Sequence, residues 1–279
     1  ASAAPKPSAP PEPQTNLKVL SYNVHSCAGM DGYISVHRIA RVIEREDPDI
    51  IALQEVDVGR ERTDHMDQVK LLADYLTMHY RFHPAIQMEE EQYGDAVLSK
   101  FPIDLMRAAA LPYRKHWLVN ERRGALWTRV RIGGERHVNV FNTHFGLGRR
   151  ERLVQARTLA GDTWLADPRC DGPVIFCGDL NSTPRSRPHR LLTQRLCDAQ
   201  EALSGHRPKR TYGGRFPLHR IDHVLVSPHF EVMDVRVPRT HLSRVASDHL
   251  PLVVTVRLRP CRKGSGSHCQ NQPPQGGCN

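Results

Sequence analysis

The 279-residue chain lacks any apolar run near the roughly 18 residues that a membrane-spanning helix needs, so no transmembrane segment is expected. It also lacks a C-x-x-C pair, although it has seven Cys residues. A zinc site is therefore not expected, and Cys177, which follows the apolar run 174–176, is interpreted as a buried thiol. The cysteines after residue 260 can form disulfides if the chain is exported, and cytoplasmic and exported locations both stay open.

The first sixteen residues lack large apolar side chains and are rich in Ala, Pro and Ser, so residues 1–16 are predicted to be a disordered tail. They contain no apolar stretch of the kind found in an intact signal peptide, although they can be the remainder of a processed one. No Pro/Gly/Ser-rich break interrupts residues 17–258, which are predicted to be one catalytic domain. Residues 259–279 are predicted to be a flexible, Cys-containing tail. A monomer is expected.

The chain is basic, with 39 Lys and Arg against 30 Asp and Glu and a formal charge of +9. Such a charge favours polyanionic partners, namely nucleic acid, an anionic membrane surface contacted from outside, or a phosphorylated small molecule. The arginines are scattered among acids and histidines rather than gathered in one run, so the charge alone does not select among these partners.

Short β-type runs recur along the chain, with amphipathic helical stripes between some of them. The predicted strands are 17–24, 49–54, 96–98, 125–132, 137–142, 174–177, 221–226, 232–237 and 250–258. The helical stripes contain Ile39, Val42 and Ile43; Val69, Leu72, Ala73 and Leu76; Leu153, Ala156, Leu159 and Ala160; and a segment near 191–196. Gly133-Gly134 predicts a hairpin. Many strands with few helices indicate two packed sheets with helices on the outer faces.

Polar residues with chemical capability lie at the ends of these strands, where active sites are usually built. Glu55 follows a buried run, and a hard carboxylate at that place suits Mg²⁺ or Mn²⁺; the alternative is an ordinary carboxylate at a strand end. In the turn 178–182, Asp179 can accept a proton from water and Asn181 can donate to a phosphoryl oxygen. The alternative there is a turn held by its own local hydrogen bonds.

Asp222 and His249 each flank an apolar run, and an acid that pairs with a histidine fixes its tautomer and raises its basicity. The two are a candidate base pair or a cationic clamp for phosphate, although a chain with 16 His residues also contains ordinary surface histidines. His144, Asn142 and Asn23 end strands and can donate to phosphate, and Asn23 can also bind metal. Arg123 is a candidate phosphate contact.

Six short motifs together resemble the endonuclease/exonuclease/phosphatase superfamily, and they occur in the order that this superfamily shows. They are Ser-Tyr-Asn at 21–23, Leu-Gln-Glu at 53–55, Asn-Thr-His at 142–144, Gly-Asp-Leu-Asn at 178–181, Arg-Ile-Asp-His at 220–223 and Ser-Asp-His-Leu-Pro at 247–251. The resemblance spans roughly residues 17–258 and implies an α/β fold, a four-layer αββα sandwich of two mixed β-sheets flanked by helices.

The resemblance also implies roles for the residues that match. One or two Mg²⁺ ions would lie on Glu55, with Asn23 close by and Asp248 beside the metal. Asp179 would orient or deprotonate the attacking water. Asn181, His144 and His249 would bind or polarise the phosphoryl group, and Asp222 would pair with His249.

One position departs from the nucleases that act at abasic sites, because His25 stands where they have an acid. The surrounding motifs are more similar to the bacterial branch near sphingomyelinase-like and lipid-anchor-remodelling hydrolases. We therefore expect a phosphodiesterase acting on a lipid head group or small molecule. A nonspecific Mg²⁺-dependent nuclease and a non-catalytic phosphate-binding module are the alternatives.

Overall fold

The computed structural model describes residues 16–88, 91–113, 122–214 and 216–260. The two tails predicted from the sequence, 1–16 and 259–279, therefore lie almost entirely outside the described residues. Within the described part, no helix combines the length and the apolar character needed to cross a membrane.

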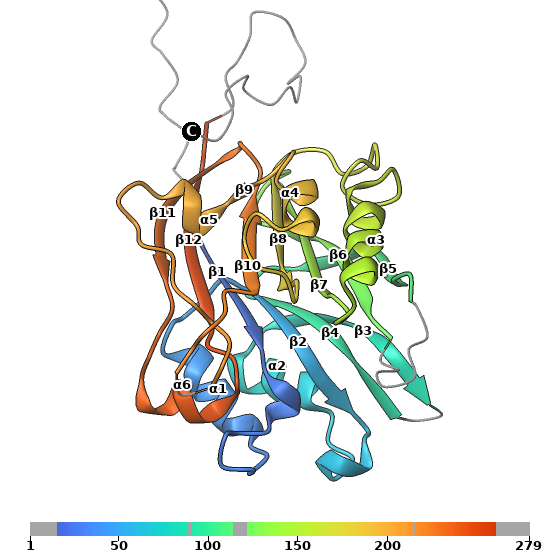
Figure 1. Ribbon diagram of the computed structural model, residues 1–279, viewed down its shortest axis with the longest axis vertical. Helices are drawn as coiled ribbons and strands as arrows, with labels where there is room; N and C mark the ends of the chain where they lie inside the picture. Colours follow the sequence, from blue (N-terminus) through green and yellow to red (C-terminus); the bar gives the residue numbers. More distant parts are fainter. Residues whose placement is uncertain (1–15, 89–90, 114–121, 215, 261–279) are drawn as a thin grey trace, which may run out of the picture.

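The first sheet has six strands in the order β11-β12-β1-β2-β4-β3 (Figure 1). β1 and β2 run parallel, and the other neighbours are antiparallel. The strands are β1 (Asn16–Asn23), β2 (Ile50–Val58), β3 (His79–Met88), β4 (Glu91–Ser99), β11 (Phe230–Arg236) and β12 (Leu252–Leu258).

The second sheet also has six strands, in the order β5-β6-β7-β8-β10-β9, with β7 and β8 parallel. The strands are β5 (Ile103–Ala110), β6 (Gly124–Arg131), β7 (His137–His144), β8 (Val174–Asp179), β9 (Cys197–Asp198) and β10 (Asp222–Val226). The hairpin predicted at Gly133-Gly134 joins β6 and β7, where Ile132 N donates to Arg136 O at 3.0 Å.

Helices cover the outer faces of both sheets (Figure 1). α1, α2 and α6 pack through apolar side chains on the first sheet, and α3 and α4 on the second. The helices are α1 (Val36–Glu44), α2 (Gln68–Leu76), α3 (Arg149–Ala160), α4 (Arg187–Leu192), α5 (Ala199–Ala202) and α6 (His241–Ala246), with the 3-10 turns η1 (His25–Cys27) and η2 (Glu61–Thr63).

The inner faces of the two sheets pack against each other through buried aliphatic side chains. Val19 and Ile50 of the first sheet belong to the same apolar cluster as Val140 and Cys177 of the second. Burial raises the pKa of the Cys177 thiol far above its usual range, in agreement with its interpretation as a small apolar group. The predicted four-layer αββα sandwich is confirmed.

Candidate active site

Each sheet contains one pair of parallel strands. These two pairs bring together the polar residues that the sequence places at strand ends. β1 ends at Asn23 and its parallel neighbour β2 carries Glu55, while β7 ends at His144 and its parallel neighbour β8 at Asp179. His144 Nδ1 lies 3.6 Å from Glu55 Oε1, and His144 Nε2 lies 3.4 Å from Asp179 Oδ2. Side chains from both sheets therefore meet at one edge of the sandwich.

Two of these functional positions have a left-handed backbone that non-glycine residues seldom adopt. Glu55 has φ of 60° and lies where the register of β2 against β4 shifts, between Leu53 and Val56. Asn181, two residues after the end of β8, has φ of 45°. Such conformations cost about 1–3 kcal/mol each and concentrate at functional sites. The bulge turns the Glu55 side chain toward the polar cluster instead of continuing the alternation of the strand.

The turn after β8 is held by its own backbone and by β7. A side chain at Gly178 would put a Cβ 2.2 Å from Thr143 O, so only glycine fits there. Asp179 Oδ1 accepts a hydrogen bond from Asn181 N at 2.8 Å. Asn181 Nδ2 donates to Phe145 O at 2.9 Å. The local hydrogen bonds of an Asp/Asn turn are therefore present, and they fix both side chains toward His144.

Asn23 links the two carboxylates that face it from opposite sheets. Its Nδ2 donates to Glu55 Oε1 at 2.9 Å and to Asp179 Oδ2 at 3.2 Å, while its Oδ1 accepts from His25 N at 3.1 Å. In this orientation the amide oxygen faces the His25 backbone, and the amide nitrogen positions Glu55 and Asp179. The metal-ligand role expected for Asn23 stays a prediction.

Asp222 and His249 form the pair that the sequence predicted. His249 Nδ1 lies 2.9 Å from Asp222 Oδ2, and Thr211 Oγ1 donates to the same oxygen at 2.5 Å. His249 Nε2 faces Asp179 Oδ2 at 3.6 Å. Burial alone lowers the pKa of His249, but the charges of Asp222 and Asp179 outweigh burial and raise that pKa. The ring is therefore cationic at neutral pH and able to donate from Nε2.

Burial raises the pKa of Asp179, and the neighbouring Asp222 carboxylate raises it further. His249 and the hydrogen bonds from Asn181 and Asn23 act in the opposite direction. The raised pKa is the property expected of a carboxylate that exchanges a proton with water near neutral pH.

Arg123 lies beneath the site rather than in it, with only 3% of its surface exposed. Its Nη1 donates to His144 Nδ1 at 2.9 Å, so that nitrogen accepts and the imidazole is neutral. Burial, and then the Arg123 charge, lower the pKa of His144 well below its usual range. The direct phosphate contact expected of Arg123 stays a prediction, while the observed contact of its guanidinium is with His144. Its charge acts on the site through His144.

Asp95 is a buried carboxyl group that the sequence motifs did not identify. It lies on β4, and burial raises its pKa well above the usual range, while the Arg123 charge lowers it. No polar motif accompanies it in the sequence, because it lies in the middle of a strand instead of at its end. The sequence offers no signal for it, because the Arg123 charge that acts on Asp95 is buried only in the folded chain.

Asn142 connects the two sheets behind the site. Its Nδ2 donates to Leu53 O and Ala96 O, both at 2.8 Å, and its Oδ1 accepts from Gln54 Nε2 at 2.7 Å. Its amide is buried and engaged at both ends, and the substrate contact expected of Asn142 stays a prediction. It fixes β7 against β2 and β4, and thereby the distance between His144 and Glu55.

Asp248 and Tyr212 lie at the open side of the cluster. The Asp248 side chain is 28% exposed, and its Oδ1 lies 3.8 Å from His25 Nδ1. The Tyr212 ring centroid is 4.6 Å from that of His249. Burial, and then the charges of Asp248, Asp179 and Glu55, raise the pKa of Tyr212. The sequence motifs missed Tyr212, which precedes Asp222 by ten residues and belongs to no strand.

The charges at this edge suit a divalent cation. Four carboxylates, those of Glu55, Asp179, Asp222 and Asp248, face the cations Arg123 and His249. The ligand atoms of Asp179, Asp222 and His249 lie within 4.8 Å of one another, but the cationic His249 is a donor and not a metal ligand. Hard oxygen donors with an excess of negative charge are the surroundings that Mg²⁺ and Mn²⁺ prefer. The residues present therefore fit the metal that the resemblance implies.

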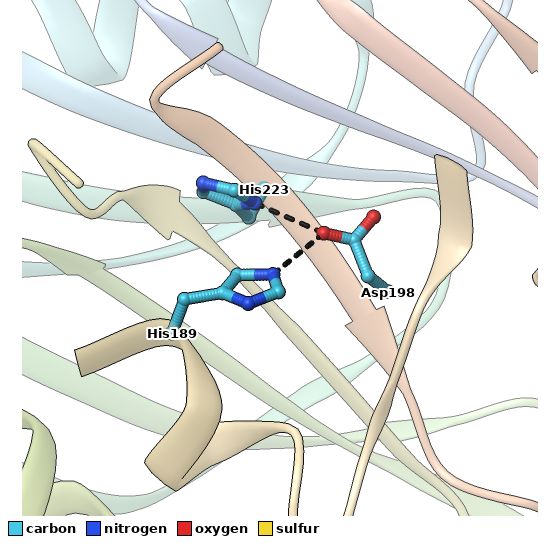
Figure 2. Close-up of side chains that lie close together, drawn as sticks. All are labelled: His189, Asp198 and His223. Atoms are coloured by element: carbon cyan, nitrogen blue, oxygen red, sulfur yellow. Dashed lines mark hydrogen bonds and ion pairs between the residues drawn. The ribbon is translucent and has the colours of Figure 1, made fainter. Parts of the chain in front are cut away.

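A second buried cluster supports the turn after β8, and we call His189, Asp198, Arg220 and His223 the Asp198 clamp. Figure 2 shows both imidazoles pointing to Asp198 Oδ2, with His189 Nε2 at 2.8 Å and His223 Nδ1 at 3.1 Å. Asp198 Oδ1 accepts from Arg220 Nη2. His223 Nε2 donates to Ser182 O at 2.9 Å, at the end of the turn that follows β8. The clamp therefore fastens that turn to β9 and β10.

The spacing of the clamp would also admit a metal ion. However, the Asp198 carboxylate already bonds to the Arg220 guanidinium and to both rings, so an added cation would meet a like charge. Burial alone would raise the pKa of Asp198, but the hydrogen bonds from His189 and His223 and the nearby charges hold it well below its usual range. The clamp is a buried ion-pair network.

Asp198→Asn is expected to lower the free energy of unfolding by about 3–5 kcal/mol at pH 7, because it leaves buried cations uncompensated. The folded-state pKa of Asp198 is depressed, so its contribution is complete above the unfolded pKa of about 3.9 and is lost as the pH falls toward the folded value. Urea unfolding should therefore show a difference from wild type that shrinks below about pH 4. Asp162→Asn, at an exposed position, is the control. An equal loss in both variants would contradict the clamp.

The sequence profile of the Endonuclease/Exonuclease/phosphatase family matches residues 20–249, which include every site residue described above. The chain belongs to this family. Its members comprise nucleases and phosphatases, and membership supports a hydrolase that acts on phosphate esters.

Individual proteins are similar to this chain over most of its length. Escherichia coli (strain K12) YbhP is 28% identical over 261 residues, which are 88% of this chain and 98% of YbhP. Inositol phosphosphingolipids phospholipase C of Saccharomyces cerevisiae is 27% identical, over 78% of this chain and 54% of the yeast enzyme. This chain thus spans about half the length of that enzyme. A Bacteroides thetaiotaomicron family member has a similar structure, with a TM-score of 0.72, 21% identity and coverage of 92% and 99%.

Proposed function

We propose that this protein is a divalent-metal-dependent phosphodiesterase that hydrolyses a lipid-head-group or small-molecule phosphodiester by activated water. The observation that carries the proposal is the cluster of Glu55, Asp179, Asp222 and His249. Asn23 donates to both Glu55 and Asp179. His249 faces both Asp179 and Asp222. The yeast relative, which is named a phospholipase C for inositol phosphosphingolipids, supports a lipid head group as substrate.

The metal would be held by Glu55 and Asp248. When bound, Mg²⁺ or Mn²⁺ would stabilise negative charge on the phosphoryl group and lower the pKa of a bound water. The roles of the other residues follow from their contacts. Asp179 lies where it can orient and deprotonate a water molecule, and Asn23 holds its carboxylate in place.

Two donors serve the phosphoryl oxygens. His249, cationic beside Asp222, presents Nε2 to the side of Asp179, where a phosphoryl oxygen or the leaving group can accept its proton. The second donor is Asn181. Its Nδ2 lies 3.0 Å from His144 Nε2, so one phosphoryl oxygen can contact both nitrogens. In hydrolysis the water oxygen would bond to phosphorus as the bond from phosphorus to the leaving oxygen breaks. Asp179 would take the proton from the water and His249 would give one to the leaving oxygen, so no net proton is consumed.

The decisive experiment is a panel of sphingomyelin, simple phosphodiesters, DNA and RNA, each with Mg²⁺ and with chelator. Hydrolysis of phosphodiesters with a small or lipid leaving group is expected only with the metal. A nonspecific nuclease, which the +9 charge favours, would instead cleave DNA or RNA with affinity that falls steeply with salt, because it binds many phosphates. Binding of phosphates without any turnover would indicate the non-catalytic module.

Asp222→Asn and His249→Ala are each expected to lower turnover about 10²-fold, and the double variant should be little worse than either, because the two side chains act as a unit. Turnover of a soluble phosphodiester at saturating substrate is the measurement. His79→Ala, an exposed histidine on β3, is the matched control. Losses that multiply in the double variant would show that the two residues act independently.

A further inference from the structure

The three most exposed large apolar side chains among the described residues lie on two loops near the active site. Phe216 is 79% exposed, Tyr33 is 71% and Leu218 is 63%, and Met30 adds a fourth at 47%. We call Phe216, Tyr33, Leu218 and Met30 the apolar rim. Scattered apolar side chains are normal on a surface, but a group of this exposure on adjoining loops marks a contact surface.

The two loops touch each other and are fastened to the active-site segment. The Met30 side chain packs against Gly214, where an added Cβ would lie 2.7 Å from Met30 Cε. Met30 N donates to Val245 O at 2.8 Å, and Gly214 N donates to Asp248 O at 2.8 Å. Asp248 precedes His249, so the apolar rim lies directly beside the site.

The backbone that presents the rim is hydrogen-bonded rather than free. Gly213 N donates to Asp248 O at 3.2 Å, and Leu218 N donates to Tyr212 O at 2.8 Å. Tyr212 also forms an antiparallel bridge with His249. The loop is therefore fixed at its base by residues of the site, while Phe216 and Leu218 project into solvent.

The chain segments that carry Phe216 and Leu218 and that hold Met30 are basic in sequence. The stretches 202–221 and 235–247 contain no Asp or Glu. Arg207, Arg210 and Arg244 are exposed within them. The acid on the other loop, Asp31, is bonded to Arg38 at 2.9 Å, which offsets its charge. Exposed apolar tips on basic segments match the surface of an anionic bilayer, where apolar groups enter the acyl boundary and cations meet the phosphates.

We propose that the apolar rim docks the active site onto an anionic lipid bilayer. This proposal rests on the proposed function, because it takes the substrate to be a lipid head group. The side chains of Leu218 and Met30 neither stack on bases nor form hydrogen bonds. They therefore suit the apolar interior of a membrane better than a nucleic acid. Docking places Asp248 and His249 at the level of the phosphates, where a head group can reach them without leaving the bilayer.

The test is flotation with vesicles of phosphatidylcholine containing phosphatidylglycerol, in chelator so that no turnover occurs. Wild type is expected to float with these vesicles and less with pure phosphatidylcholine. The double variant Phe216→Ser/Leu218→Ser should lower the partition coefficient about tenfold or more, because two large apolar side chains no longer leave water. The matched control is Leu105→Ser/Met233→Ser, two exposed apolar residues on β5 and β11.

Hydrolysis of bis(p-nitrophenyl) phosphate with Mg²⁺, measured without vesicles, separates docking from catalysis. Equal activity of wild type and the rim variant, with vesicle binding lost only in the variant, supports the proposal. The proposal is overturned if wild type does not bind the vesicles, or if the rim variant floats like wild type. It is also overturned if the rim binds DNA in place of vesicles, or holds two copies of the chain in a dimer. Vesicle binding by a protein that hydrolyses no phosphodiester would support docking and remove the proposed function.

Discussion

Asp179→Asn is expected to lower turnover by a factor on the order of 10²–10⁴ while substrate still binds, since general-base catalysis typically contributes about that much. The change keeps the shape of the side chain, and Asn181 N and Asn23 remain beside it. It removes the negative charge that lies 3.6 Å from His249 Nε2 and the oxygen that takes a proton from water. The defect should therefore appear in kcat far more than in KM.

The competing explanation is that Asp179 only shapes the turn after β8. In that case Asp179→Asn lowers the melting temperature, and turnover per folded molecule stays near wild type. Melting temperature and kcat measured on the same preparation separate the two explanations. Asp104→Asn, at an exposed position on β5, controls for the loss of one surface charge elsewhere. Normal turnover in a destabilised Asp179→Asn protein would falsify the mechanism proposed above.

A smaller effect is expected at the donor beside Asp179. Asn181→Ala should reduce turnover by a factor approaching 10²–10³ with a smaller change in KM, because it removes a donor aimed at charge that grows in the transition state. The same substitution also removes the bond to Phe145 O. The melting temperature of the variant therefore has to be measured beside its kinetics, and a rate per folded molecule equal to wild type would count against the role of Asn181.

The fold was predictable where strands are apolar and central. The predicted strands 17–24, 137–142 and 174–177 correspond to β1, β7 and β8, whose side chains are nearly all buried. The strands that the sequence analysis missed, β3, β5 and β9, all lie at the edges of their sheets. Edge strands are half solvated and carry weaker patterns.

The sequences of the missed strands show why. β3 contains Pro84, which fits only an edge or a bulge, and its register against β4 shifts at that residue. β5 ends in Arg107 followed by three alanines, a composition that favours helix in isolation. Tertiary pairing with β6 overrides that preference, and single-sequence patterns do not contain such pairing.

The sequence predicted which strand ends lie close together, but not every side chain that reaches them. Residues at strand ends could be placed near one another because parallel strands end at the same edge. The burial of Arg123 beside His144 and the hydrogen bond from Gln54 to Asn142 could not be predicted, because both depend on contacts between residues far apart in the sequence. Asp95 and Tyr212 were missed for the same reason, since each reaches the site only through contacts across the fold.

Glu55→Gln is expected to lower metal-dependent turnover by a factor on the order of 10³, because a neutral amide cannot supply the charge that a hard cation needs and the metal contributes several kcal/mol to charge stabilisation. The oxygen of the Gln amide can still accept the hydrogen bond from Asn23, which reaches the carboxylate at 2.9 Å. The left-handed backbone at Glu55 is unchanged by the substitution. Stability should therefore change much less than activity.

The measurement is kcat as a function of Mg²⁺ concentration for wild type, Glu55→Gln and the control Glu135→Gln, which alters an exposed carboxylate in the hairpin between β6 and β7. If Glu55 binds the metal, the variant should need far more Mg²⁺ to reach half of its maximal rate, and calorimetric titration should show weaker binding of the metal alone. Loss of turnover with unchanged metal affinity would assign Glu55 to positioning His144, from which it lies 3.6 Å away. Undiminished wild-type turnover in chelator would remove the metal from the mechanism, because the four carboxylates would then stabilise no cation that the reaction requires.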